Sequence, residues 1–162
     1  MNVHQNSIRT QGLFKGLEAL KNEDLIDFDL ERPQQDALSQ TLWECLIYGW
    51  DKFFSPDPKG PFLFNAEKWV AKSGVFDFGS YLEEVSRRFE SCLPSVTDFD
   101  KKQVAASVKT VQLALFYQFK LMFQESPKGN VICFGGAIMP ISQPFDYFNY
   151  AESVFKTFCS FI

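Results

Sequence analysis

Histidine is almost absent from this chain, and its one copy, His4, stands among the polar first ten residues. Catalytic triads and dyads with an imidazole base need a histidine held inside the fold, so the sequence disfavours that chemistry. The same scarcity disfavours metal sites built on histidine. A reaction would have to use carboxylates, lysine, tyrosine or cysteine. We therefore lean against enzymatic activity without excluding it, and we expect no cofactor.

Cysteine is sparse as well, and the four copies stand far apart, at positions 45, 92, 133 and 159. Zinc sites usually bring their ligands in close pairs such as Cys-x-x-Cys, and the sequence has none. We expect reduced thiols and no metal site. Residues 1–30 contain no charged-then-apolar leader. Both observations favour a cytoplasmic protein.

Clusters of basic residues and long apolar runs are missing too. No Lys/Arg cluster exceeds two residues, whereas a nucleic-acid binder needs many cations beside phosphates. We therefore expect no nucleic-acid partner. The longest apolar candidate for a membrane span, residues 104–123, contains Lys109 and Lys120. Lysine is costly in a bilayer core, so we expect a core helix here and no membrane association.

Aromatic residues are abundant, with 19 Phe, five Tyr and three Trp among 162 residues. Each ring can bury roughly 150–250 Å², so we expect a core built largely from rings. An aromatic pocket for a small apolar ligand is the alternative. It would lie between the long helix at 98–126 and the segment at 131–141, lined by Trp43, Trp50, Phe116, Phe119 and Phe134.

The apolar spacing predicts a mostly α-helical fold in one domain, residues 1–162, of which residues 1–10 are expected to be flexible. The architecture expected is a compact bundle of about five to six helices around a central long helix at about 98–126. Further helices are predicted from Pro33 to Phe54, from Asn65 to Ser73, from Ser80 to Pro94, and from Pro144 onward. Residues 131–141 are predicted to form a short extended or hairpin segment.

Three finer expectations follow from helical periodicity. In the long helix, a second apolar row that includes Tyr117 and Leu121 predicts burial on most sides. In the last helix, Phe148, Ala151, Phe155 and Phe158 are expected to face inward. In the helix from Ser80, Glu84 and Arg88 are four residues apart and predict an ion pair.

Negative charge is concentrated near the N-terminus. Seven acids and two bases between Glu18 and Asp36 give that stretch a net charge of −5, more than the −4 of the whole chain. Acidic and apolar residues alternate from Asp27 to Glu31, which predicts an extended segment lying over a groove between helices. Its three carboxylates lack the glycine-containing loop of a calcium site, so a solvated acidic face is expected instead of a metal site.

These observations do not identify a function on their own. The leading hypothesis is a non-catalytic protein-interaction or regulatory module, whose partner is a protein with a basic groove or a second copy in a homodimer. The candidate partner-binding residues are Asp27, Phe28, Asp29, Leu30, Glu31, Phe54 and Phe62. The apolar-ligand domain is the alternative, and a carboxylate- or cysteine-based enzyme comes third.

Overall fold

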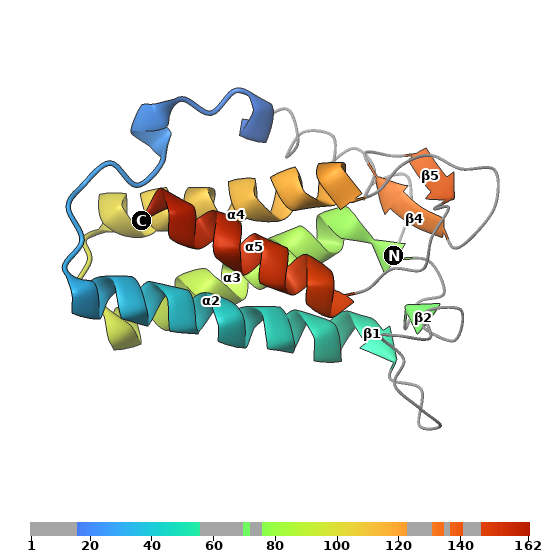
Figure 1. Cartoon of the computed structure of the whole chain (residues 1–162), viewed down its shortest axis with the longest axis horizontal. Coiled ribbons are helices and arrows are strands. Elements are labelled where there is room, and N and C mark those ends of the chain that lie inside the picture. Colours follow the sequence, from blue (N-terminus) through green and yellow to red (C-terminus); the bar gives the residue numbers. More distant parts are fainter. Residues whose placement is uncertain (1–15, 56–69, 72–75, 123–130, 135–136, 141–146) are drawn as a thin grey trace.

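Four long helices form a bundle in the computed structural model, which describes residues 16–55, 70–71, 76–122, 131–134, 137–140 and 147–162. They are α2 (Arg32–Phe53), α3 (Phe78–Val96), α4 (Lys101–Met122) and α5 (Tyr147–Phe161). Both α2 and α4 pack against α3 and α5, and successive helices run in opposite directions (Figure 1). The predicted compact helical bundle is confirmed.

Short strands gather at the end of the bundle where α3 and α5 begin (Figure 1). Strand β1 (Phe54–Ser55) pairs antiparallel with β2 (Val70–Ala71). Strand β3 (Phe76–Asp77) runs parallel to β4 (Val131–Phe134), which pairs antiparallel with β5 (Ala137–Pro140). The short extended or hairpin segment predicted at 131–141 is confirmed at the described residues 131–134 and 137–140, which pair as two antiparallel strands. The helix predicted from Asn65 to Ser73 is wrong at Val70–Ala71, and its other residues lie outside the described ranges.

Helix α2 follows its predicted bounds within one residue. Pro33 lies in the first turn, where its missing N–H leaves no helical hydrogen bond unmade. The buried side includes Leu38, Leu42, Leu46 and Trp50, which recur every four residues and form one face. This face points into the middle of the bundle.

Helix α3 is longer than predicted at both ends. It begins at Phe78 instead of Ser80, and it continues past Pro94 to Val96. Proline removes the bond to the carbonyl four residues earlier, but that residue, Glu90, is exposed, so water can solvate its carbonyl. The backbone N–H and the hydroxyl of Thr97 both donate to the Leu93 carbonyl. These bonds close the last turn beyond the proline.

Helix α4 begins at Lys101, three residues after the predicted Asp98. Its cap is reciprocal: the Gln103 N–H donates to the Asp100 carboxylate at 2.8 Å, and the Asp100 N–H donates to the Gln103 amide oxygen at 3.0 Å. The expected burial on most sides is wrong at Tyr117 and Leu121, which are 51% and 57% exposed. One side of α4 therefore faces solvent.

The inward face predicted for α5 is confirmed at Ala151 and Phe158, which are buried, and is wrong at Phe148. Phe148 is 37% exposed and Phe155 only half-buried, whereas Tyr147 and Tyr150 are completely covered. The Tyr147 hydroxyl donates to the Leu46 carbonyl, and the Tyr150 hydroxyl donates to the Leu115 carbonyl at 2.7 Å. Because both hydroxyls have partners, burying these tyrosines leaves no polar group unsatisfied.

Aromatic rings fill the centre of the bundle, as the composition predicts. Phe78 of α3 stacks on Phe119 of α4 with ring centroids 3.8 Å apart. Tyr81 meets the rings of Tyr147 and Tyr150, and its hydroxyl lies 2.8 Å from that of Tyr147. Burial raises the pKa of all three tyrosines. They are therefore neutral hydrogen-bonding groups of the core.

Candidate functional site

The acidic segment at 26–31 lies along the outside of the bundle, just before α2 (Figure 1). Asp27, Asp29 and Glu31 are exposed, whereas Phe28 and Leu30 are half-buried. Such alternation arises when an extended chain rests one face on a packed surface. The predicted alternation is confirmed, and it follows a short 3₁₀ turn, η1 (Asn22–Asp24).

Three contacts hold this segment on the bundle. The Ile26 N–H donates to the Thr110 hydroxyl of α4 at 3.1 Å. The Phe28 ring meets Phe99 edge-on with centroids 5.5 Å apart, and Leu30 packs against the core. Since these anchors fall on alternate residues, the acidic side chains between them remain on the outer face.

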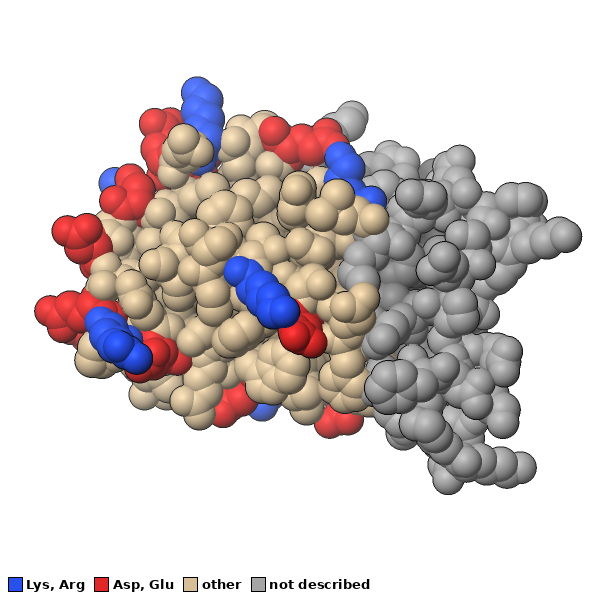
Figure 2. All heavy atoms as spheres, viewed as in Figure 1, with Lys and Arg blue, Asp and Glu red and all other residues tan. Residues whose placement is uncertain are grey.

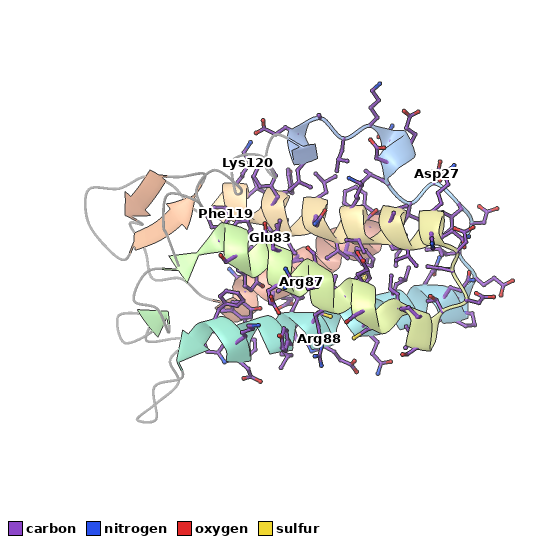
Figure 3. The ribbon with its side chains drawn as sticks, turned by 180° about the vertical axis from the view of Figure 1, so that it is seen from behind. Asp27, Glu83, Arg87, Arg88, Phe119 and Lys120 are labelled. Atoms are coloured by element: carbon purple, nitrogen blue, oxygen red, sulfur yellow. The ribbon has the colours of Figure 1, made fainter. Side chains whose placement is uncertain are left out.

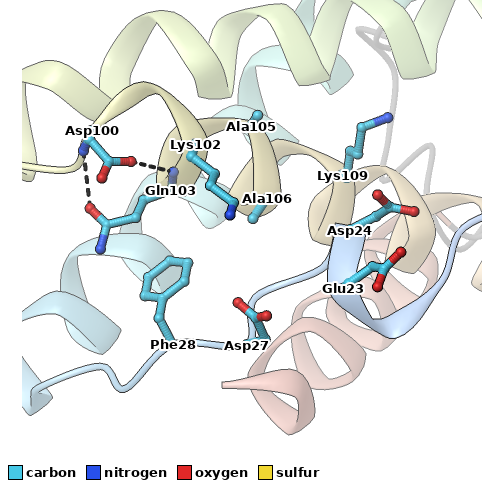
Figure 4. Close-up of a pocket in the computed structure, with 10 residues that line it drawn as sticks. All are labelled: Glu23, Asp24, Asp27, Phe28, Asp100, Lys102, Gln103, Ala105, Ala106 and Lys109. Carbon is cyan, nitrogen blue, oxygen red and sulfur yellow. Dashed lines mark hydrogen bonds between the residues drawn. The ribbon is translucent and has the colours of Figure 1, made fainter.

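A groove of about 330 Å³ lies between this segment and the first half of α4 (Figure 4). Its lining comprises four acids, two lysines and four uncharged residues: Glu23, Asp24, Asp27, Asp100, Lys102, Lys109, Phe28, Gln103, Ala105 and Ala106. The Asp27 carboxylate and the Lys102 ammonium point toward one another across it (Figure 4). The groove thus combines a net negative lining with an apolar part.

The carboxylates of the groove and of the segment beside it differ in how far they are already engaged. Asp100 caps α4, and Asp24 accepts a hydrogen bond from the Lys21 N–H at 3.0 Å. Within the described ranges, Asp27, Asp29 and Glu31 make no ion pair. These three carboxylates therefore retain their capacity to accept hydrogen bonds from a cation.

The other candidate partner-binding residues, Phe54 and Phe62, are not brought to this groove by any described contact. Phe54 forms part of β1, paired with Ala71. Phe62 lies outside the described residues. The candidate interface is accordingly restricted to the segment before α2 and to α4.

The five residues of the alternative apolar pocket fall in different surroundings. Trp50, Phe116 and Phe119 are buried in the core, where Trp50 contacts the Tyr147 ring at a centroid distance of 5.0 Å. Trp43 is 36% exposed on the outer side of α2. Phe134 belongs to β4, and its side chain lies outside the described part of the structure. The described rings among them pack against other core side chains or reach the surface.

A second polar cluster lies between α2 and α3. From the sequence, only an ion pair between Glu84 and Arg88 was predicted in this region. The Glu84 carboxylate binds Lys52 at 2.9 Å and Arg87 at 3.0 Å, and it accepts a hydrogen bond from the Tyr48 hydroxyl at 3.1 Å. The predicted Glu84–Arg88 pair is wrong, because the Arg88 guanidinium lies over the Tyr48 ring, 4.6 Å from its centroid. Figure 3 places Arg87 and Arg88 on α3, well away from Asp27.

This cluster gives a prediction for the pH dependence of stability. The hydrogen bond from Lys52 holds the pKa of Glu84 below its ordinary value of 4.5. A depressed carboxyl pKa adds stability above the unfolded-state pKa, and that stability is lost as the pH falls through the folded-state pKa. We expect Glu84→Gln to unfold a few degrees below the unsubstituted chain at pH 7, with a smaller difference at pH 3.

Thermal unfolding followed by circular dichroism at the two pH values measures this effect. Glu90→Gln is the matched control, since Glu90 is an exposed acid on the same helix. Its difference from the unsubstituted chain should stay near zero throughout. A Glu84→Gln deficit that is as large at pH 3 as at pH 7 would contradict the assignment.

The described cysteines are thiols, and the one that is fully buried lies in surroundings that disfavour its charged form. Cys45, Cys92 and Cys159 are free, and burial raises the pKa of Cys45 to about 12, which disfavours its nucleophilic thiolate. Among the side chains that could be placed, no three His, Cys, Asp or Glu come together as metal ligands. No described helix is both long and apolar enough to traverse a bilayer.

Comparison of the chain with family models, with curated proteins and with solved structures finds no match.

Proposed function

We propose that this chain is a non-catalytic protein-interaction module that binds a basic segment of a protein partner along the acidic segment at 26–31 and the groove beside it. The observation that carries the proposal is the row of Asp27, Asp29 and Glu31, which are exposed and without an ion pair among the described residues. Fixed carboxylates of one sign steer and orient a complementary cationic partner.

The anchoring of the segment favours recognition by a preformed surface. Phe28 and Leu30 pack against the chain itself, so in this proposal they position the acids instead of entering the partner. A surface that is already ordered loses less conformational entropy on binding than a flexible tail. Phe28 and Leu30, which the sequence suggested as partner-binding residues, are thus proposed to position the acids and not to touch the partner.

The chemistry of the groove narrows the class of partner. Lysine or arginine side chains can place their charges on the acidic row while their methylene stems lie over Ala105 and Ala106. A protein partner suits this mixture of apolar and acidic lining better than a nucleic acid, whose phosphates the acids would repel. A cytoplasmic location belongs to the same proposal, supported by the free thiols.

A fluorescein-labelled peptide of alternating lysine and leucine is a suitable probe, titrated with the full chain by fluorescence anisotropy. We expect the triple substitution Asp27→Asn, Asp29→Asn and Glu31→Gln to weaken binding about tenfold, because each exposed ion pair contributes up to about 1 kcal/mol. Affinity of the unsubstituted chain should also fall as salt is raised.

The control is a second triple variant with the same change in net charge on α2 and α3: Glu44→Gln, Asp51→Asn and Glu90→Gln. All three of these acids are exposed. We expect this variant to bind the peptide nearly as well as the unsubstituted chain. If both triple variants lose equal affinity, or if neither does, the acidic row is not the binding site.

A further inference from the structure

The surface formed by α2 and α5 exposes aromatic side chains beside a few charged ones. Trp43 of α2 packs edge-on against Phe155 of α5 at a centroid distance of 5.7 Å, and Trp50 contacts the exposed Phe148. An open groove of about 580 Å³ runs between the two helices. It is lined by Asp36, Ser39, Gln40, Trp43, Glu152, Phe155 and Lys156.

Figure 2 shows this face with α5 across its middle. Acidic and basic side chains gather mainly around the margin of the described part of this face (Figure 2). The charged residues that line the groove are Asp36, Glu152 and Lys156. Exposed aromatic rings are typical of protein interfaces. The charges within the face determine which partner it can accept.

Helix α5 carries only two charged residues, Glu152 and Lys156. They are one helical turn apart, form an ion pair at 3.1 Å, and have side chains that are 60% and 73% exposed. Val154 lies midway between them in the sequence and is buried. On the outer surface of α5, the acid and the base therefore lie at equal distances from a point at the level of residue 154 along the helix axis.

From this arrangement we infer that the α2–α5 face binds the same face of a second copy of the chain, across a two-fold axis that meets the outer side of α5 midway between Glu152 and Lys156. An axis perpendicular to α5 and within the interface makes the two α5 helices antiparallel. Glu152 of each copy then faces Lys156 of the other. The two charged residues of α5 are therefore complementary to those of the second copy in this orientation.

The same axis brings the aromatic side chains of the two copies together. Phe155 and Trp43 line the same groove as Glu152 and Lys156, and their rings contact one another, so both lie close to the axis. A tryptophan at the centre of an interface commonly contributes much of the binding energy, while the flanking charges fix the orientation. A parallel arrangement of the two helices would instead oppose like charges.

This surface shares no residue with the lining of the acidic groove. Each acidic groove would therefore keep its whole lining in the dimer, and a dimer would offer two binding sites to a partner. Failure of either proposal therefore leaves the other standing.

Sedimentation velocity of the full chain over a range of concentrations tests the inference. We expect the unsubstituted chain to form a dimer. Glu152→Lys gives α5 two positive charges and Lys156→Glu gives it two negative charges, so each variant alone should dissociate at least about tenfold more readily. A mixture of the two variants should recover the dimer as a heterodimer, and the double variant should recover it alone.

A second pair of variants tests the aromatic centre. Trp43→Ala should raise the dissociation constant of the dimer about 30-fold or more, whereas Tyr117→Ala, on the exposed side of α4, should leave it unchanged. Circular dichroism confirms that each variant is folded. A chain that stays monomeric throughout, single charge variants that dimerise normally, or a mixture that does not recover the dimer would each overturn the inference.

Discussion

Phe119→Ala is expected to lower the free energy of unfolding by about 3–5 kcal/mol, the range for removing a large buried ring from a packed core. Phe119 is almost completely covered and stacks on Phe78 at a centroid distance of 3.8 Å. Alanine would remove this ring contact between α3 and α4 and leave a cavity. Unfolding in guanidinium chloride, followed by circular dichroism, measures the change.

Tyr117→Ala provides the control for this experiment on the same helix. Tyr117 is more than half exposed, so its loss should change stability by no more than about 0.5 kcal/mol. Since both variants replace an aromatic residue of α4 by alanine, helix propensity changes similarly in the two. Equal losses in the two variants would show that the Phe78–Phe119 stack is not an important core contact.

Gly49→Ala is expected to destabilise the protein although alanine is the better helix former. A methyl group at position 49 would lie 2.8 Å from both Tyr81 Cε1 and Val85 Cγ2 and 3.3 Å from the Tyr147 hydroxyl. These neighbours are completely buried, so they cannot move away into solvent. Overpacking of this kind costs about 1–3 kcal/mol, which exceeds the propensity gain of about 1 kcal/mol.

Gly16→Ala makes the same chemical change where there is space. Residue 16 is helical and exposed, and a methyl group there would have no neighbour within 4 Å. We expect this variant to be as stable as the unsubstituted chain or slightly more stable. Guanidinium unfolding of the two variants side by side separates the effects, and a stabilised Gly49→Ala would refute the close packing of α2 on α3.

The helical class of the fold and the outline of α2, α3 and α4 could be predicted from local signals. Apolar residues at intervals of three and four fix the buried face of α2, and Pro33 marks its first turn. The hairpin at 131–141 was likewise predictable as a short apolar segment after the long helix. These features depend on neighbours in the sequence, so no knowledge of distant contacts was needed.

Helix ends were harder to predict, because several local signals compete there. Pro94 normally ends a helix, but Thr97 supplies two hydrogen bonds to Leu93 and the turn persists. Asp98 and Asp100 are both plausible caps for α4, and the reciprocal bonds with Gln103 select Asp100. The choice depends on geometry that residue types alone leave open.

The orientation of α5 shows where long-range contacts override hydrophobicity. Phenylalanine is more apolar than tyrosine, so periodicity favours Phe148 over Tyr147 as the inward residue. The core, however, offers backbone carbonyls of Leu46 and Leu115 to the tyrosine hydroxyls. Those acceptors belong to other helices and become available only when the bundle has assembled.

The candidate site also has features that the sequence predicts and features that only tertiary contacts decide. Acidic and apolar residues alternate from Asp27 to Glu31, which is a pattern of adjacent positions. This local pattern was enough to predict that the carboxylates lie on one side of an extended chain. That the other side rests on Thr110 and Phe99, more than seventy residues away, depends on packing between distant parts of the chain. Nearest neighbours determine which way a side chain points, whereas the surface that it meets is created when the helices come together.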